Sequence, residues 1–211
     1  KKNGKKIFDH EAVAETINLP TYALVPVRDS VIFPHLMNPL SVGRERSIRA
    51  VEAALAENKS IIVFLQRDPE TQDPTIDDLY PIGTEVAVGR MLRMPDGTTN
   101  VITQGNARVR IVEIIQRDPY LCARVRPIPE PSKKSLETEA LMRAVLALFE
   151  KVVRLSQNMP EDAYVAAMNS DTPGWLSDLI GSALNIELLK RQELLETLDP
   201  VVRLQKISVL L

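Results

Sequence analysis

Short apolar runs dominate the first 127 residues of the chain, and helical periodicity dominates the rest. The first part holds runs rich in β-branched residues, each bounded by Gly, Pro, Asp or Asn, which is typical of strands. Asp96 and Gly97 predict a tight hairpin turn, because both residue types tolerate positive φ. The predicted strands are Thr21 to Val25, Ile61 to Leu65, Glu85 to Arg93, Asn100 to Gln104, Arg108 to Ile115 and Leu121 to Arg126.

One amphipathic helix interrupts these strands. Residues Glu45 to Glu57 place Ile48, Val51 and Leu55 on one helical face, which we expect to pack against the core. Several strands at short spacing with one inserted helix predict a small, strongly curved sheet or barrel whose edges are protected by closure.

The second part is predicted to be helical. Leu136 to Ser156 repeats apolar residues at helical spacing, and a proline soon afterwards bars its continuation. The last helix, Pro200 to Leu211, has no stop signal, so the pattern favours a chain cut within a longer helix. Three prolines suit the first turns of further helices: Pro160, Pro173 and Pro200.

The change from strands to helices falls at Pro127-Ile-Pro-Glu-Pro131. Three prolines in five residues favour an extended connector over helix or sheet. We therefore predict an α+β chain with a β-rich part over residues 19–127, a linker over 128–134 and an all-α helical bundle over 135–211. We expect few contacts across the linker, so that the two parts move relative to each other.

Composition excludes several classes of protein. The 26 Lys and Arg residues against 28 Asp and Glu give a net charge of −2, which disfavours a dedicated nucleic-acid binder. Cys122 is the single cysteine and cannot form an internal disulfide, as expected in a reducing compartment. Because the sequence has no apolar stretch of about 18 residues, we expect a cytoplasmic protein without a membrane partner. Residues 1–18 are Lys-rich without an apolar run, which predicts a mobile tail.

The motifs of common enzymes are missing from the sequence. None of the eight glycines stands in a nucleotide-binding loop or a nucleophile elbow, and no metal-binding spacing of His and Cys occurs. We interpret His35 as a structural or surface residue and Cys122 as a small buried hydrophobe. The sequence thus predicts no catalytic, cofactor-binding or metal-binding residue in this chain.

The segment from Pro26 to Gly43 has apolar residues that follow neither a strand nor a helix period. It is interpreted either as a buried loop that lines one end of the barrel or as a surface groove that binds apolar segments. The candidate contact residues are Val31, Ile32, Phe33, Leu36 and Met37. The candidate charged rim consists of Arg28, Asp29, Arg44, Glu45 and Arg46.

An ordered series of motifs carries a family resemblance. The run LPTYALVPVRDSVIFPHLMNPLSVGRERSIRAVEAAL is followed by LYPIGTEVAVGRML, MPDGT and GNARVRI, and later by SDTPGWLSDLIGSALN and KRQELLETLDPVVRLQKISVLL. Over residues 19–211 this series resembles the N-terminal region of the ATP-dependent Lon protease family. Each motif alone is weak, whereas their order and spacing together are specific.

The resemblance implies a PUA-like β-rich first part and a helical second part. It implies a non-catalytic region that captures unfolded or degron-bearing proteins and supports a homohexamer. The AAA+ motor, which uses ATP and Mg, and the Ser/Lys protease domain of that family lie C-terminal to this region. Val31, Ile32, Phe33, Leu36 and Met37 would then contact substrates.

Two alternatives remain open at this point. PUA-like folds also bind RNA, although the acidic balance and the 4% aromatic content weaken that interpretation. A stand-alone protein with this region and no motor is the other alternative, which the uncapped final helix argues against.

We predict that the purified chain hydrolyses neither ATP nor peptides, because the sequence lacks the loops and nucleophiles for both reactions. A coupled ATPase assay and a fluorogenic peptide assay measure this. Turnover that disappears on substitution of one of the chain's own residues would contradict the interpretation.

Overall fold

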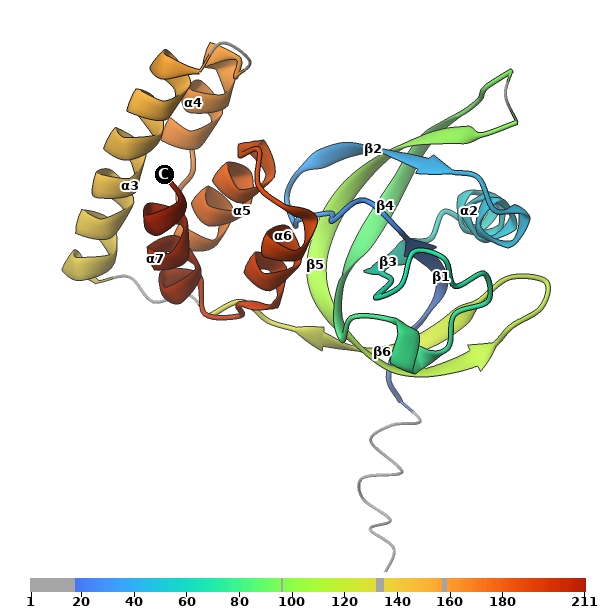
Figure 1. The fold of residues 1–211 in the computed structure, drawn as a ribbon. Helices are drawn as coiled ribbons and strands as arrows, with labels where there is room; N and C mark the ends of the chain where they lie inside the picture. Colours follow the sequence, from blue (N-terminus) through green and yellow to red (C-terminus); the bar gives the residue numbers. More distant parts are fainter. Residues whose placement is uncertain (1–17, 96, 132–134, 157–158) are drawn as a thin grey trace, which may run out of the picture.

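The computed structural model describes residues 18–95, 97–131, 135–156 and 159–211. Apart from one α-helix and one 3₁₀ helix inserted between strands, the strands come first and the helices follow, so the chain is α+β, as the sequence predicts (Figure 1). Nearly all of the predicted N-terminal tail, one residue of the predicted hairpin turn and most of the predicted linker lie outside the described residues.

Six strands form one mixed sheet with the order β2-β5-β4-β3-β1-β6. The strand β6 also pairs with β5, so five strands close into a ring, and β2 is attached to β5 as an edge strand. The strands are β1 (Thr21–Val27), β2 (Met37–Val42), β3 (Ile61–Leu65), β4 (Ile82–Arg93), β5 (Thr99–Gln116) and β6 (Cys122–Ile128). The helices are α2 (Glu45–Glu57), the 3₁₀ helix η1 (Ile76–Asp78), α3 (Leu136–Leu155), α4 (Glu161–Met168), α5 (Pro173–Ala183), α6 (Leu188–Glu196) and α7 (Pro200–Leu210).

Five strands differ from their prediction, of which β1 ends two residues later and β4 begins three residues earlier than predicted. The two predicted strands between Asn100 and Ile115 are one continuous strand, β5, whose first half pairs with β2 and whose second half pairs with β6. The strand β2 was not predicted, because its Pro39 is typical of loops; as an edge strand it tolerates the missing donor. Pro127 lies in β6 opposite Val109, not in the connector.

The helix α2 covers one face of the sheet. Its Val51 is fully buried, as predicted, whereas Ile48 and Leu55 lie at the margin of the same cluster. Leu40 and Val42 of β2 point into this cluster as well. The other face of β2 is therefore turned away from α2.

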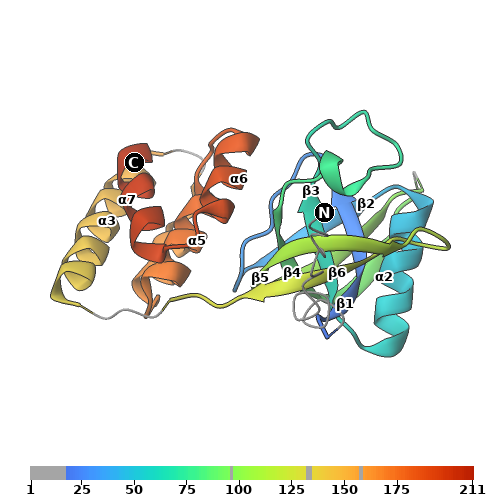
Figure 2. The same ribbon diagram turned by 90° about the horizontal axis from the view of Figure 1, so that it is seen from below.

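Two of the three prolines expected in first turns lie there, whereas Pro160 is the N-cap residue just before α4. Pro173 and Pro200 occupy the first turns of α5 and α7, and the Asp199 side chain accepts hydrogen bonds from the backbone N–H groups of Val201 and Val202. In two views α6 lies next to the sheet and α3 lies farthest from it (Figures 1 and 2). Among the described residues no helix is both long and apolar enough to cross a membrane.

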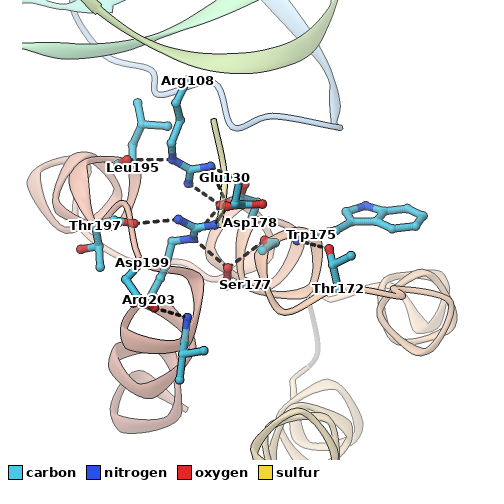
Figure 3. Close-up of polar contacts among 12 residues, drawn as sticks. Arg108, Glu130, Thr172, Trp175, Ser177, Asp178, Leu195, Thr197, Asp199 and Arg203 are labelled. Atoms are coloured by element: carbon cyan, nitrogen blue, oxygen red, sulfur yellow. Dashed lines mark hydrogen bonds and ion pairs between the residues drawn. The ribbon is translucent and has the colours of Figure 1, made fainter. Parts of the chain in front are cut away.

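A buried ionic cluster joins the two halves (Figure 3). The Asp178 carboxylate of α5 is fully buried and accepts two hydrogen bonds from Arg108 of β5, at 2.6 and 2.8 Å. The same carboxylate lies 3.1 Å from Nε of Arg203 in α7. Arg203 is also fully buried and forms an ion pair with Glu130, which follows β6. Two guanidinium groups and two carboxylates thus meet where sheet and helices touch.

Neighbouring groups satisfy the remaining donors of this cluster. Arg108 donates from Nε to the Leu195 carbonyl at 2.9 Å, and Arg203 donates to the Ser177 hydroxyl and the Thr197 carbonyl, each at 2.7 Å. Burial lowers the pKa of Arg203, and the charge of Asp178 opposes that shift. The opposite charges and the hydrogen bonds within the cluster offset the loss of water.

A glycine leaves the space in which Glu130 reaches the cluster. A Cβ atom on Gly174 would lie 1.9 Å from the Glu130 carboxylate, so any larger residue would expel that side chain. Gln192 of α6 adds a further contact by donating to the Ile82 carbonyl of β4 at 3.0 Å. The expectation that few contacts cross the linker is therefore wrong, and movement between the halves would have to break this cluster.

We predict that Asp178→Asn lowers the free energy of unfolding by about 3–5 kcal/mol, because two buried guanidinium groups lose their shared counter-charge. Urea denaturation measures the change. Asp171→Asn is the matched control: this exposed carboxylate is expected to change the free energy of unfolding by less than about 0.5 kcal/mol. An Asp178→Asn midpoint equal to that of the unsubstituted chain would contradict the role given to the cluster.

Candidate functional site

The predicted apolar contact residues do not share one environment. Phe33 is fully buried and Ile32 is 4% exposed, whereas Met37 is 70% exposed. Val31 and Leu36 are half-buried. The interpretation as a buried loop therefore holds for Ile32 and Phe33, and these two side chains are not available to a partner in this structure.

The missing periodicity has a physical cause, since this loop lies between two cores. Ile32 packs into the cluster under α2, and Phe33 packs into the cluster of the helical half. The Ile32 carbonyl accepts a hydrogen bond from the buried Thr84 hydroxyl at 2.5 Å. A Cβ atom on Gly105 would lie 2.2 Å from the Phe33 carbonyl oxygen, so only glycine permits this close approach.

A different set of apolar side chains is exposed on the sheet. In the register of β2, β5 and β4, Pro39 lies opposite Ile102, and Leu92 lies opposite Asn100, which is two residues before Ile102. Alternation places Pro39, Ile102 and Leu92 on the face that points away from α2. Met37 is two residues before Pro39 and lies on the same face. We call Met37, Pro39, Leu92 and Ile102 the outer apolar face.

The outer apolar face is exposed to solvent. Leu92 is 51% exposed and Ile102 is 41% exposed, and Met94 at the adjoining hairpin end is also exposed. The hairpin of β4 and β5 extends beyond the rest of the sheet (Figure 1). Sequence reasoning found Met37 alone among the four residues. The available signal was the alternation around Ile102, where an apolar residue stands at a position that the pattern assigns to solvent.

The predicted charged rim divides into two groups. Arg28, Asp29 and Arg44 line one pocket near the start of α2. Glu45 instead forms an ion pair with Arg49, and Arg46 forms ion pairs with Asp73 and Asp118. These five residues therefore do not surround the predicted apolar loop as one rim.

The described residues offer little for catalysis. They contain no group of three or more His, Cys, Asp or Glu side chains placed to hold a metal ion. Cys122 is half-buried, and burial raises the pKa of its thiol, which keeps it protonated and weakly nucleophilic near neutral pH. His35 adopts a positive φ of 65° in the loop and donates its backbone N–H to the Gly105 carbonyl at 2.8 Å.

Comparison with known sequences gives relatives that all carry the name Lon. The model of the ATP-dependent protease La (LON) substrate-binding domain family matches residues 21–211. Lon protease 2 of Herpetosiphon aurantiacus is 41% identical over 207 residues, which is 98% of this chain and 25% of that protein. Lon protease of Dictyoglomus thermophilum is 43% identical over 202 residues, which is 95% of this chain and 25% of that protein. The chain thus spans a quarter of the length of these relatives.

Solved structures share the fold. The N-terminal domain of a Mycobacterium avium complex Lon protease aligns with a TM-score of 0.75 at 20% identity, covering 89% of this chain and 96% of that one. A Lon N-terminal domain protein from Xanthomonas campestris aligns with a TM-score of 0.63 at 21% identity, covering 90% and 98%.

We predict that Phe33→Ala lowers the stability of the chain far more than Met37→Ser does. Truncation of a fully buried Phe leaves a cavity between the halves and is expected to cost about 3–5 kcal/mol of unfolding free energy. Met37→Ser is expected to cost less than about 0.5 kcal/mol, because the side chain is mostly exposed. Chemical denaturation of both variants measures the difference, and equal midpoints would show that Phe33 is not a core residue.

Proposed function

The chain belongs to the family of LON substrate-binding domains, and on that premise we propose that it captures protein substrates for a longer ATP-dependent protease. The relatives named Lon protease are about four times as long as the matched region, which supports placing the ATPase motor and the Ser/Lys protease domain outside this chain. The part of the reaction assigned to these residues is binding.

The observation that carries the proposal is the outer apolar face. Met37 and Leu92 are each more than half exposed, and they stand with Pro39 and Ile102 on three adjacent strands. Exposed apolar groups that gather on one surface mark an interaction site more often than scattered ones do. Met37 is also a flexible side chain, which suits partners of varied shape.

The proposed occupant is an apolar segment of an unfolded or degron-bearing protein. A folded protein hides such segments and a damaged one exposes them, so contact with an apolar face selects for exposure and not for a defined sequence. Burial of one large side chain on a partner contributes about 1.5–3 kcal/mol before ordering costs, so a few contacts give weak, reversible capture.

Assembly would make weak capture sufficient. A dissociation constant near 10 μM corresponds to roughly −7 kcal/mol, and several copies in one assembly raise avidity without new contacts. We include the homohexamer, the cytoplasmic location and the PUA-like nature of the ring of strands in the proposal. The resemblance to the Lon family supports all three proposals. The pairing of β6 with both β1 and β5 supports only the ring of strands.

The proposal predicts that Met37→Ser together with Ile102→Ser weakens binding of a casein-like unfolded protein by roughly tenfold or more, because two apolar contacts are lost. Fluorescence anisotropy with labelled unfolded protein measures the affinity. Leu155→Ser is the matched control: its side chain is 85% exposed, but it lies at the end of α3 in the helical half. The affinity of the Leu155→Ser variant for the unfolded protein is expected to equal that of the unsubstituted chain.

The salt dependence separates this function from RNA binding. Apolar capture should survive an increase from about 50 to 200 mM salt, whereas several phosphate contacts would lose orders of magnitude in affinity over that range. Binding of single-stranded RNA is measured in parallel. Tight, steeply salt-dependent RNA binding without capture of unfolded protein would replace the proposed function with the nucleic-acid alternative.

A further inference from the structure

We propose that the pocket at the start of α2 binds a phosphate group, either as free phosphate or as a phosphomonoester. The pocket has a volume of about 410 Å³ and lies between the ends of β1 and β2 and the first turn of α2. Arg28, Asp29, Arg44 and Ser47 supply its charged and hydroxyl groups. This site lies apart from the outer apolar face, and the proposal does not rest on substrate capture.

The two arginines of this pocket have no acidic partner among the described residues. Arg44 donates to the Gln66 side chain at 2.5 Å and to the Thr71 carbonyl at 2.9 Å, both of which are neutral acceptors. Arg28 donates to the Gln72 side chain at 3.2 Å, which is also neutral. Neither guanidinium group forms an ion pair with a described residue, although the Asp29 carboxylate lines the same pocket.

Arg44 also has an unused donor. Its Nε atom is buried and has no hydrogen-bond partner. Burial, and to a smaller extent the nearby charge of Arg28, lowers the pKa of Arg44. An anion beside both guanidinium groups would stabilise their charged forms and so oppose this shift. A buried donor without an acceptor costs free energy, which an acceptor on a ligand would recover.

The first turn of α2 adds donors at the same place. Arg44 is the N-cap residue and its side chain does not cap the helix. The backbone N–H of Ser47, the first-turn residue that lines the pocket, has no acceptor among the described residues. The partial positive charge of a helix N-terminus favours anions. Ser47 lines the pocket together with Arg28 and Arg44.

Ser47 is a second, independent sign of a ligand. The residue is 5% exposed and lines the pocket, and its hydroxyl has no hydrogen-bond partner among the described residues. The hydroxyl is therefore free to donate to a ligand that enters the pocket. A ligand in the pocket that accepts from the hydroxyl and backbone N–H of Ser47 and from Nε of Arg44 would give all three donors an acceptor.

The balance of charges points to a phosphate group. Two guanidinium groups and the helix N-terminus outweigh the single carboxylate of Asp29, so a doubly charged anion fits better than a singly charged one. A phosphate oxygen cluster is acceptor-only and can meet several donors at once. The volume exceeds the ~30 Å³ share of one liquid water by more than tenfold, which leaves room for the organic part of a phosphomonoester.

The test is a titration of the ¹⁵N-labelled chain with inorganic phosphate at constant ionic strength. We expect saturable shifts of the amide resonances of Gly43, Arg44 and Ser47, which line the pocket. Ser47→Ala and Arg28→Gln should each weaken binding roughly tenfold, because each removes a hydrogen bond to a charged ligand. Asp29→Asn should strengthen binding, since it removes the opposing charge.

Arg46→Gln is the matched control for Arg28→Gln. It removes the same charge from a neighbouring position, but its guanidinium pairs with Asp73 at 2.8 Å and with Asp118 at 3.0 Å. Its affinity for phosphate should equal that of the unsubstituted chain. Thermal unfolding without phosphate checks that every variant is folded, and Arg44 is left intact because it holds the loop at Thr71.

Acetate and O-phosphoserine form the two other arms of the titration. Binding of both phosphate and O-phosphoserine supports the site; tighter binding of O-phosphoserine identifies a phosphomonoester as the ligand, and equal binding identifies free phosphate. Absence of saturation, acetate binding as tight as phosphate, or equal losses in Arg46→Gln and Arg28→Gln would each overturn the proposal.

Discussion

The shared carboxylate of Asp178 is the constraint on which the arrangement of the halves depends. It is fully buried and receives Arg108 from the sheet and Arg203 from the last helix. Buried ion pairs add little to stability in comparison with apolar packing, but loss of one partner is costly. The cluster therefore acts mainly by permitting one relative position of sheet and helices, in which all the charges are satisfied.

That position explains why the loop before β2 is apolar without a period. The sheet and the helices each present a core to the same segment, so consecutive residues Ile32 and Phe33 enter different clusters. Gly105 on β5 admits the backbone of Phe33, and Gly174 on α5 admits Glu130. Small residues at these two contacts are as necessary for the junction as the charges are.

Local patterns predicted the elements better than they predicted the junction. The fold class, the helix α3 and the proline-started helices α5 and α7 follow from periodicity and capping, which act within a few residues. The strand β2, the burial of Phe33 and the ionic cluster depend on partners far apart in sequence, and Arg108 and Asp178 are 70 residues apart. A lone carboxylate within the apolar helix around Asp178 was a readable sign of a buried partner.

The continuous strand β5 can transmit force from the outer apolar face to the ionic cluster. Ile102 on the outer apolar face and Arg108 in the ionic cluster lie on the same strand, and six residues of extended chain span about 20 Å. A bound protein segment that is pulled away from the outer apolar face would put β5 under tension along the strand. The hydrogen bonds of β5 to β4 and β6 would then share this force in shear. Tension would then reach Asp178 and the last helix without first bending a loop.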